Sequence, residues 1–461
     1  MLNGTTLRHT LQAILPAAVI EDEARALGVV ERSRKLDVTA LVRALVLSEG
    51  CEDSGRLADA FRRYQAEETD PVVRGAFYGW MDAETAALFE KLLDRGMAYA
   101  ATRPTHLPGV LAGVDDWIIV DSETVTLRDA LKEPLPASGS PAGIKVHKEY
   151  SVGRGCMVGV HFSSAREHDS RHLDVNERFR DKGLLFDLGY ASLARLRQCH
   201  DHATRYVLRL KDDWKPRIER LVRGEVTEEI LPGTDFDAAL LADVLLMQGQ
   251  CIDADVVLGG TTAPTVRCRL VAVPTSPGGK TYRSYLTNLP RNTHGPLQVA
   301  ELYRVRYEIE LDNKLDKSTA RLDQIRATTV SSVKILLCAA LMHSLLADLL
   351  AHEHLLKRVA ENSVRTPPLH PMLVAHVLRT CHMLLLDALS LPHTPQATWD
   401  ALANTIVRHG YDPNWRRRPS VLDRIRGVTA PAGRPRRRTM RQCPPQAAPF
   451  RGNLAQRSAS N

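Results

Sequence analysis

The 461-residue sequence lacks the cysteine pairs that build small metal-binding modules. Its eight cysteines are scattered singly, and no Cys-x-x-Cys pair occurs. This spacing argues against a zinc ribbon. Isolated cysteines in a chain of this length are typical of reduced thiols in the cytoplasm. No basic segment followed by an apolar run opens the sequence, so we expect no signal peptide.

Long apolar runs are also scarce. The longest, Ile335–Ala351, has 17 residues and includes His343 and Asp348. It is at the lower limit for a membrane-spanning helix. We therefore predict a buried core helix here and no association with a membrane.

The end of the chain has almost no acidic residues. Residues 416–461 contain twelve arginines, no lysine and one acid, Asp423, which gives +11 for this segment. The whole chain carries +7, so residues 1–415 carry −4. A segment rich in Arg, Pro, Ala and Ser buries too little apolar surface to order itself. We predict an Arg-rich disordered tail, and the overall basic charge says little about the body of the protein.

The middle of the sequence predicts an α/β domain. Short apolar or alternating runs predict three strands in succession, followed by helix, strand, helix and strand. That order is the order of a ribonuclease H-like domain, although fold analogy alone establishes no activity. The predicted strands are 117–120, 144–152, 157–162, 184–186 and 206–210, and the predicted helices between them are 170–180 and 192–203.

Composition shifts along the chain predict six segments. A Pro-containing linker follows the helical pattern of residues 83–99, for which Asp82 is the expected N-cap. Later helices are expected over about 297–322 and 331–356. The predicted segments are a helical domain (1–108), the first part of a ribonuclease H-like core (109–215), a mostly β insertion (216–290), the helical second part of the core (291–360), a C-terminal helical region (361–415) and the disordered tail (416–461).

Three acidic residues stand out by their context. Asp121 and Asp187 each follow an apolar strand, and Glu310 lies in a predicted helix. A carboxylate just beyond a strand lies at the rim of a sheet and can face a cleft. Three such carboxylates could hold divalent cations, which prefer hard oxygen ligands. The alternative is that these acids, among 54 in the chain, are surface charges or turn formers.

The helix around Glu310 carries a stripe of functional groups. Tyr303, Arg306, Glu310 and Lys317 are spaced by three, four and seven residues, which places them on one helical face. A solvated face with an ordinary Arg–Glu pair would give the same pattern.

The spacing Tyr303-x2-Arg306-x3-Glu310-x6-Lys317 resembles the Tyr-Arg-Glu-Lys signature of bacterial insertion-sequence DDE transposases of the insertion-sequence-four family. Asp121-Ser122 and Asp187-x-Gly189-Tyr190 resemble the two aspartate motifs of that family. The separations, 66 residues between the aspartates and 123 from the second to Glu310, also fit. Leu188 and Tyr307 depart from the family, which often has Arg and Trp at those places.

The resemblance implies a transposase that cleaves DNA at transposon ends and transfers the freed strand into target DNA. Asp121, Asp187 and Glu310 would be catalytic residues that hold two Mg²⁺ or Mn²⁺ ions. Tyr303, Arg306 and Lys317 would bind transposon-end DNA. The helical domain 1–108 would be a DNA-end-binding domain, and the ribonuclease H-like core would be the catalytic core. The resemblance further implies a homodimer on DNA, with inverted-repeat ends and target DNA as partners, acting in the cytoplasm at the nucleoid.

Two rival functions stay open at this stage. One is a domesticated, catalytically inactive DNA-binding derivative, and the other is a nuclease of ribonuclease H type. Two pairs of basic residues are also undecided. Lys145 and His147 could approach DNA or the metal site, or be solvated beside Glu149, and Arg209 and Lys211 are candidate phosphate contacts.

Overall fold

The computed structural model describes most of the chain up to residue 427. One compact unit contains residues 1–429. The boundaries of the six segments predicted from the sequence stay predictions. The described residues are 1–30, 37–47, 58, 61–62, 64–65, 72–139, 142–223, 226–228, 235, 251–260, 263–275, 282–318, 322, 325–363, 366–391, 393–415 and 419–427.

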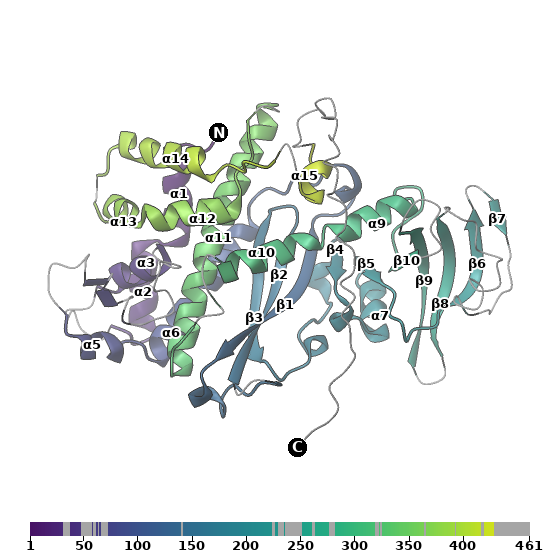
Figure 1. Ribbon diagram of the computed structural model, residues 1–461, viewed down its shortest axis with the longest axis horizontal. Coiled ribbons are helices and arrows are strands. Elements are labelled where there is room, and N and C mark those ends of the chain that lie inside the picture. Colours follow the sequence, from purple (N-terminus) through teal and green to yellow (C-terminus); the bar gives the residue numbers. More distant parts are fainter. Residues whose placement is uncertain are drawn as a thin grey trace, which may run out of the picture. The chain divides into compact units, whose positions relative to one another are not determined.

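A ten-stranded mixed sheet forms the centre of the molecule (Figure 1). Its strand order is β3-β2-β1-β4-β5-β10-β9-β8-β6-β7. β1 pairs with β2 antiparallel and with β4 parallel, and β4 pairs with β5 parallel. The strands are β1 (Trp117–Leu127), β2 (Ala142–Ser151), β3 (Cys156–Ser164), β4 (Gly183–Phe186), β5 (Arg205–Arg209), β6 (Arg217–Arg223), β7 (Val226–Glu228), β8 (Ile252–Gly260), β9 (Ala263–Pro274) and β10 (Tyr282–Thr287).

The five strands predicted for the core are all present. Their order and directions, with β3-β2-β1 antiparallel and β4 and β5 added in parallel, fit a ribonuclease H-like fold. β6 to β10 continue the same sheet, because β10 pairs antiparallel with β5. The segment predicted as mostly β is therefore an extension of the central sheet in its described part, while residues 236–250 lie outside the described residues.

Alternate side chains of the central strands enter two different cores. Ile118, Val120 and Phe186 pack in one apolar cluster with helix α7 (Leu193–Asp201). Trp117 and Ile119 pack in another cluster with helices α9 (Pro296–Arg304) and α10 (Tyr307–Ser318). Because successive strand residues point to opposite faces, both faces of the sheet are covered. α9 and α10 cross the face to which odd-numbered residues of β1 point (Figure 1).

A helical bundle packs beside the β3 edge of the sheet (Figure 1). Asp82 caps the helix that was predicted there, accepting a hydrogen bond from Thr85 N at 2.8 Å. The helices outside the sheet layers are α1 (Gly4–Ile14), α2 (Ala17–Ala26), α3 (Val38–Leu47), α5 (Arg74–Gly79), α6 (Ala83–Ala101), α11 (Val330–Ala360), α12 (Pro371–Thr380), α13 (His382–Ser390), α14 (Gln396–Gly410) and α15 (Val421–Ile425).

α11 is the central helix of this bundle. It is the one described helix that is long and apolar enough to cross a membrane by itself, yet 94% of its apolar window is buried inside the protein. Its neighbours include α1, α3, α6 and α12. The expectation of a buried core helix is therefore confirmed. The six cysteines in the described part of the chain are free thiols.

The helix predicted over residues 170–180 is wrong. Only two short 3₁₀ turns, Asp169–Arg171 and Glu177–Phe179, form there. The guanidinium of Arg195 donates hydrogen bonds to the carbonyl oxygens of Ser170 and Leu173 at 2.6 and 2.5 Å. These bonds satisfy carbonyls that a regular helix would use internally, so the irregular path is stable.

The single helix predicted over 297–322 is also wrong, because it divides into α9 and α10. The amides of Val305, Arg306 and Glu308 donate to carbonyls three residues earlier. This tighter pattern is that of a 3₁₀ turn and changes the direction of the chain. Residues 303 and 310 therefore belong to different helices.

The start of the disordered tail at residue 416 is placed too early. α15 has a capping box formed by Ser420 and Asp423, and Leu422 is buried. Arg426 donates to the carbonyl oxygen of Val152 at 2.6 Å. Local capping and one long-range contact thus order residues 419–427 despite their composition. The rest of the predicted tail, 428–461, lies outside the described residues.

The hydrogen bonds of buried His354 require a neutral ring. Its Nδ1 accepts from the backbone N–H of Leu2 at 3.3 Å, and its Nε2 donates to the carbonyl oxygen of Pro367 at 3.1 Å. Burial lowers the pKa of His354 to about 4. The folded form therefore resists protonation, whereas the unfolded chain takes up a proton near the ordinary pKa of 6.5.

We predict that His354 makes the protein less stable as pH falls from 6.5 toward 4. At pH 5.5 this histidine alone should lower the free energy of unfolding by about 1 kcal/mol relative to pH 7.5. Urea unfolding at the two pH values measures the difference, which should shrink by that amount in His354→Asn. The exposed His393 provides the control His393→Asn. The same pH difference in wild type and His354→Asn would contradict the prediction.

Candidate active site

Asp121, on β1, lies beside Asp187, which directly follows the neighbouring strand β4. β1 and β4 run parallel with Val120 opposite Phe186. The residue that follows each of these two is one of the aspartates. β4 ends at Phe186, while β1 continues to Leu127 against β2. The predicted end of the first strand at Asp121 is therefore wrong, because β2 supports β1 beyond that point. Each aspartate comes two residues after a strand residue, Ile119 or Leu185, that packs on the face covered by α9 and α10.

α10 brings Glu310 to these aspartates. Asn313, one turn after Glu310, lies with its Nδ2 3.5 Å from Oδ2 of Asp121. Arg306, in the turn before α10, donates from Nη2 to Glu310 Oε1 at 2.5 Å, and its Nη1 lies 3.9 Å from Asp121 Oδ2. One guanidinium thus lies between a strand acid and a helix acid.

The electrostatics of the site reflect this crowding. Burial raises the pKa of Asp121, and the charges of Asp187 and Glu310 raise it further. The backbone N–H of Ser122, 2.9 Å from Asp121 Oδ1, and the charge of Arg306 act in the opposite direction. Although burial acts to lower it, the pKa of Arg306 is raised, because Tyr303 and all three acids favour its charged form. The three acids therefore share one electrostatic environment.

The chemistry of these three side chains suits a hard divalent cation, because all of them offer carboxylate oxygens. In the described part of the chain, no three His, Cys, Asp or Glu side chains are gathered closely enough to hold a metal ion. The positive charge between Asp121 and Glu310 is supplied by Arg306 instead. A cation bound by both acids would therefore have to displace this guanidinium.

The other two residues of the predicted stripe lie in different surroundings. Tyr303 is buried, with its ring 5.3 Å from that of Tyr285 and 6.0 Å from Arg306 Cζ, and burial raises its pKa to about 12. Lys317 is about half exposed, and its Nζ lies 3.6 Å from Glu123 Oε2. Lys317 is two helical turns beyond Glu310 on α10, so it lies farther along β1, beside Glu123.

A cavity of about 500 Å³ opens beside Asp187 and Glu310. Its wall is rich in arginine and tyrosine. Arg209 was singled out from the sequence, but Arg283, Tyr285 and Arg304 were not. These residues could be linked to the site only once the pairing of β10 with β5 was known. That pairing places Tyr285 opposite Arg209, and the alternation of side chains along β10 places Arg283 on the same face. The cavity is lined by Asp187, Arg209, Arg283, Tyr285, Tyr303, Arg304, Arg306, Tyr307, Glu310 and Val421.

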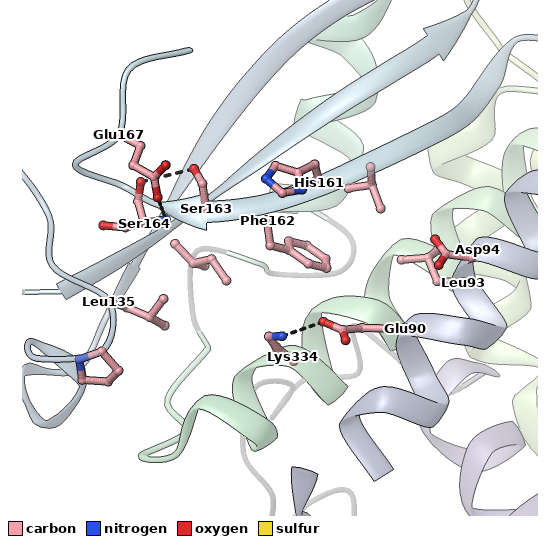
Figure 2. Close-up of a pocket in the computed structure, with 13 residues that line it drawn as sticks. Glu90, Leu93, Asp94, Leu135, His161, Phe162, Ser163, Ser164, Glu167 and Lys334 are labelled. Atoms are coloured by element: carbon pink, nitrogen blue, oxygen red, sulfur yellow. Dashed lines mark hydrogen bonds and ion pairs between the residues drawn. The ribbon is translucent and has the colours of Figure 1, made fainter. Parts of the chain in front are cut away.

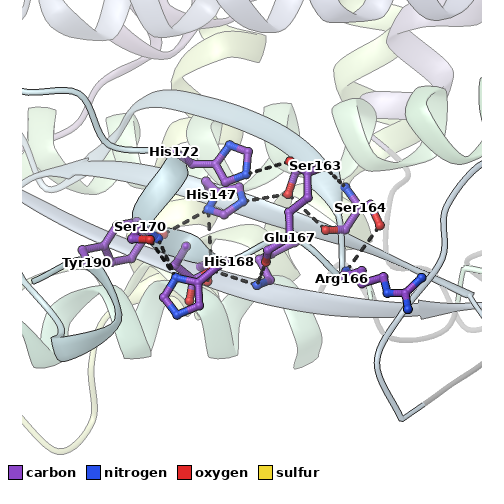
Figure 3. Close-up of polar contacts among 12 residues, drawn as sticks. His147, Ser163, Ser164, Arg166, Glu167, His168, Ser170, His172 and Tyr190 are labelled. Atoms are coloured by element: carbon purple, nitrogen blue, oxygen red, sulfur yellow. Dashed lines mark hydrogen bonds and ion pairs between the residues drawn. The ribbon is translucent and has the colours of Figure 1, made fainter.

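Lys145 and His147, on β2, belong to a polar network beside the strand of Asp121. Figure 3 shows His147 in this network, between Tyr190 and Ser163. Lys145 Nζ donates to Asp169 Oδ1 at 2.9 Å, and the same oxygen accepts from Ser122 Oγ at 2.9 Å. His147 is buried between Tyr190 Oη at 3.0 Å and Ser163 Oγ at 2.9 Å. Neither residue is solvated beside Glu149, as one of the open alternatives had it. Both support the strand segment that carries Asp121.

The histidine rings of this network stack on one another. The ring of His172 lies 4.2 Å from that of His147 and 5.0 Å from that of His161, measured between centroids. Burial, together with the charge of His172, lowers the pKa of His147 to about 3. His147 therefore stays neutral at physiological pH and acts as a packed polar group.

A second cavity, of about 490 Å³, lies between β3, α6 and α11 (Figure 2). His161 and Phe162 form part of one wall, and Lys334 pairs with Glu90 at 2.8 Å on the opposite side. None of the residues predicted to be functional lines this cavity. Asp187, Glu310 and the arginine-rich wall belong to the other cavity.

Comparisons with known proteins agree with this geometry. Residues 113–346 match the family described as "Transposase DDE domain". The transposase for insertion sequence element IS1151 of Clostridium perfringens is 24% identical over 285 residues, which are 53% of this chain and 59% of that protein. The chain thus spans about three-fifths of the length of this curated relative.

A solved structure, the cryo-EM structure of the piggyBac transposase synaptic complex with hairpin DNA, covers 87% of this chain and 85% of its own, with a TM-score of 0.47 and 11% identity. The family match covers half of the chain and includes all three acids of the site. On that match, this chain belongs to the transposase DDE domain family.

Proposed function

We propose that this protein is a DNA transposase that cleaves DNA at transposon ends and joins the freed strand to target DNA. The observation that carries the proposal is the position of Asp121 on β1 next to Asp187 at the end of the adjacent parallel strand β4, with Glu310 joined to Asp121 through Arg306. This arrangement lies within the segment that matches the transposase DDE domain family. The Tyr-Arg-Glu-Lys spacing further favours the insertion-sequence-four family.

The reaction follows from the chemistry of the three acids. Asp121, Asp187 and Glu310 would hold two Mg²⁺ or Mn²⁺ ions, whose charge makes an attacking hydroxyl more acidic and neutralises a leaving oxygen. Phosphoryl transfer requires charge neutralisation and in-line positioning more than covalent catalysis. The role of the protein is therefore to hold carboxylates in place and to align the DNA strand with them.

The cavity beside the acids supplies the groups that grip the strand. Arg209, Arg283, Arg304 and Arg306 offer guanidinium donors to phosphate oxygens, which they can bind with two hydrogen bonds each. Tyr303 and Tyr285 present aromatic surface in the same wall, on which a base turned out of the helix can stack. Lys317, half exposed near the C-terminal end of α10, would contact a DNA phosphate farther along the strand.

The remaining parts of the proposal concern partners. The helices within residues 1–108 would bind the inverted-repeat ends, and the active assembly would be a homodimer on DNA. The protein would act in the cytoplasm, at the nucleoid. Two alternatives, an inactive DNA-binding derivative and a nuclease of ribonuclease H type, predict different outcomes in the experiments below.

Removal of any one acid should abolish cleavage while DNA binding persists. Asp121→Asn, Asp187→Asn and Glu310→Gln each delete a carboxylate charge, and each should reduce nicking of a labelled inverted-repeat end by at least about a thousandfold. The exposed Asp201, on α7, provides the matched control Asp201→Asn. Gel-shift titration checks binding by the same variants.

The outcomes separate the three functions. Robust nicking by any one variant would refute the assignment of that residue. Wild-type protein that binds the ends without nicking under any divalent metal would indicate the inactive derivative. Cleavage without preference for the inverted repeat would indicate the nuclease.

Arg306→Gln should affect metal and DNA binding in opposite directions. The substitution removes the cation that pairs with Asp121 and Glu310, so Mn²⁺ should bind several-fold more tightly, while DNA ends bind more weakly because a phosphate contact is lost. Arg304→Gln removes an exposed arginine of the same cavity and should weaken DNA binding alone. Titration of Mn²⁺ by electron paramagnetic resonance measures the first effect. Weaker Mn²⁺ binding by Arg306→Gln would contradict the prediction.

Truncation after Gly427 should reduce the salt dependence of DNA binding. The deleted segment contains seven arginines and no acid, so the slope of log K against log salt should fall by up to about six. Cleavage at low salt should persist, because such contacts add affinity rather than sequence choice. Binding measured from 50 to 300 mM KCl tests the slope. Loss of all nicking at low salt would show that the tail has an essential role.

A further inference from the structure

A buried lysine joins the strand of Asp121 to the helix of Glu310. Lys148, on β2, lies opposite Asp121 in the β1–β2 pairing, and only 1% of its side chain is exposed. Its Nζ lies 3.2 Å from Glu123 Oε1 on β1 and 3.1 Å from Asp312 Oδ2 on α10, and it also donates to Asp316. A single ammonium thus contacts carboxylates from two elements that carry the site.

The same carboxylates continue the connection to α11. Ser344 donates from Oγ to Asp316 Oδ1 at 2.5 Å. Asp348, which is fully buried on α11, has a pKa raised well above its ordinary value by burial and by the charges of Asp312 and Asp316. We call Glu123, Lys148, Asp312, Asp316 and Asp348 the Lys148 cluster. It links β1, β2, α10 and α11 at one point.

The cluster fixes the rotation of α10 about its axis. Asp312 and Asp316 are one turn apart and face the sheet together, held by Lys148. At about 100° per residue, this orientation also determines where residues 310 and 313 point. Asn313 meets Asp121 in the structure, and Glu310 meets Arg306. The position of Glu310 relative to Asp121 therefore depends on the Lys148 ammonium, which binds Asp312, two residues after Glu310.

The attraction is necessary because the carboxylates would otherwise repel one another. Glu123 is 2% exposed, and its two oxygens face Lys148 and Lys317. With Lys148 absent, a strand acid and two helix acids would confront each other without solvent to screen them. The helix would be driven away from β1, and Glu310 would move with it.

We propose that Lys148 is a positioning residue for Glu310, acting through Asp312 and Asp316 to hold the helix acid beside Asp121. The inference rests on the proposed function, since it concerns how the three carboxylates bind a divalent cation. It assigns no contact between Lys148 and DNA or metal. Lys148 acts only through the carboxylates that it binds.

A double-mutant cycle between the cluster and Glu310 tests this role. The variant Lys148→Met/Asp316→Asn removes one positive and one negative charge, so the cluster gains no net charge. Its Mn²⁺ dissociation constant, measured by electron paramagnetic resonance, should rise by about tenfold or more, as should that of Glu310→Gln. The combined variant should bind no more weakly than either parent, because the cluster acts through Glu310.

Additive losses in the cycle, or unchanged Mn²⁺ affinity in Lys148→Met/Asp316→Asn, would overturn the inference. Circular dichroism checks that the variant is folded. If it does not fold, the cycle is run with Lys148→Arg, which keeps the charge but displaces the helix by its bulk. Coupling to Glu310 is expected there as well, and additivity would again overturn the inference.

Arg269 provides a matched control for the loss of a buried ion pair. Its guanidinium, 4% exposed, pairs with Asp253 at 2.7 Å across β8 and β9, away from α10. Arg269→Met/Asp253→Asn should lower the melting temperature while leaving Mn²⁺ affinity unchanged. Wild-type protein that neither binds Mn²⁺ nor nicks DNA would instead refute the proposed function, so the two failures are distinguishable.

Discussion

Carboxylates that β1 and α10 bring together repel one another, and two cations of this chain hold them in place. Arg306 lies between Asp121 and Glu310, and Lys148 lies between Glu123 and the acids of α10. The first cation is partly exposed at the mouth of a cavity, and the second is sealed inside the protein. This difference suits two roles: an exposed guanidinium can exchange for another cation, whereas a buried ammonium cannot leave.

The sheet explains why these charges occur where they do. β4 ends at Phe186 while β1 continues, so the sheet narrows at the level of Asp121 and Asp187. Two carboxylates can occupy this step because α10 crosses it without filling it with apolar side chains. Upstream of the step, Trp117 packs so closely on β4 that a Cβ at Gly183 would lie 2.2 Å from its ring. The apolar packing of one end of the strands thus gives way to the polar site at the other.

Much of the fold could be predicted from sequence because its strands are short, apolar and separated by clear turns. The five core strands and the helix capped by Asp82 were predicted this way. The irregular segment after β3 could not be, because Arg195, some 20 residues downstream, satisfies its carbonyls. Helical propensity is a local quantity, and a distant guanidinium overrides it. Likewise, α15 forms inside an arginine-rich stretch because Arg426 donates a hydrogen bond to the carbonyl oxygen of Val152.

The candidate active site could also be predicted only in part from the sequence. Helical spacing placed Tyr303, Arg306, Glu310 and Lys317 on one face, and Tyr303, Arg306 and Glu310 do share a cavity wall with Asp187. The turn at Val305 and Arg306 separates Tyr303 from the helix of Glu310. Lys317 lies two turns beyond Glu310 on α10 and faces Glu123. The Lys148 cluster had no sequence signal as a group, because its members are separated by up to 225 residues and all but Asp348 look like ordinary surface charges.

That separation bears on how such a site is built. A residue that touches the reacting atoms must have a particular chemistry, and a short spacing of residue types can reveal it. A residue that positions the others needs only a charge at the right depth, and many sequences satisfy that requirement. Lys148 is recognisable only because the fold buries it with Glu123, Asp312 and Asp316 around it. Burial turns an unremarkable lysine into the group on which the distance between a strand acid and a helix acid depends.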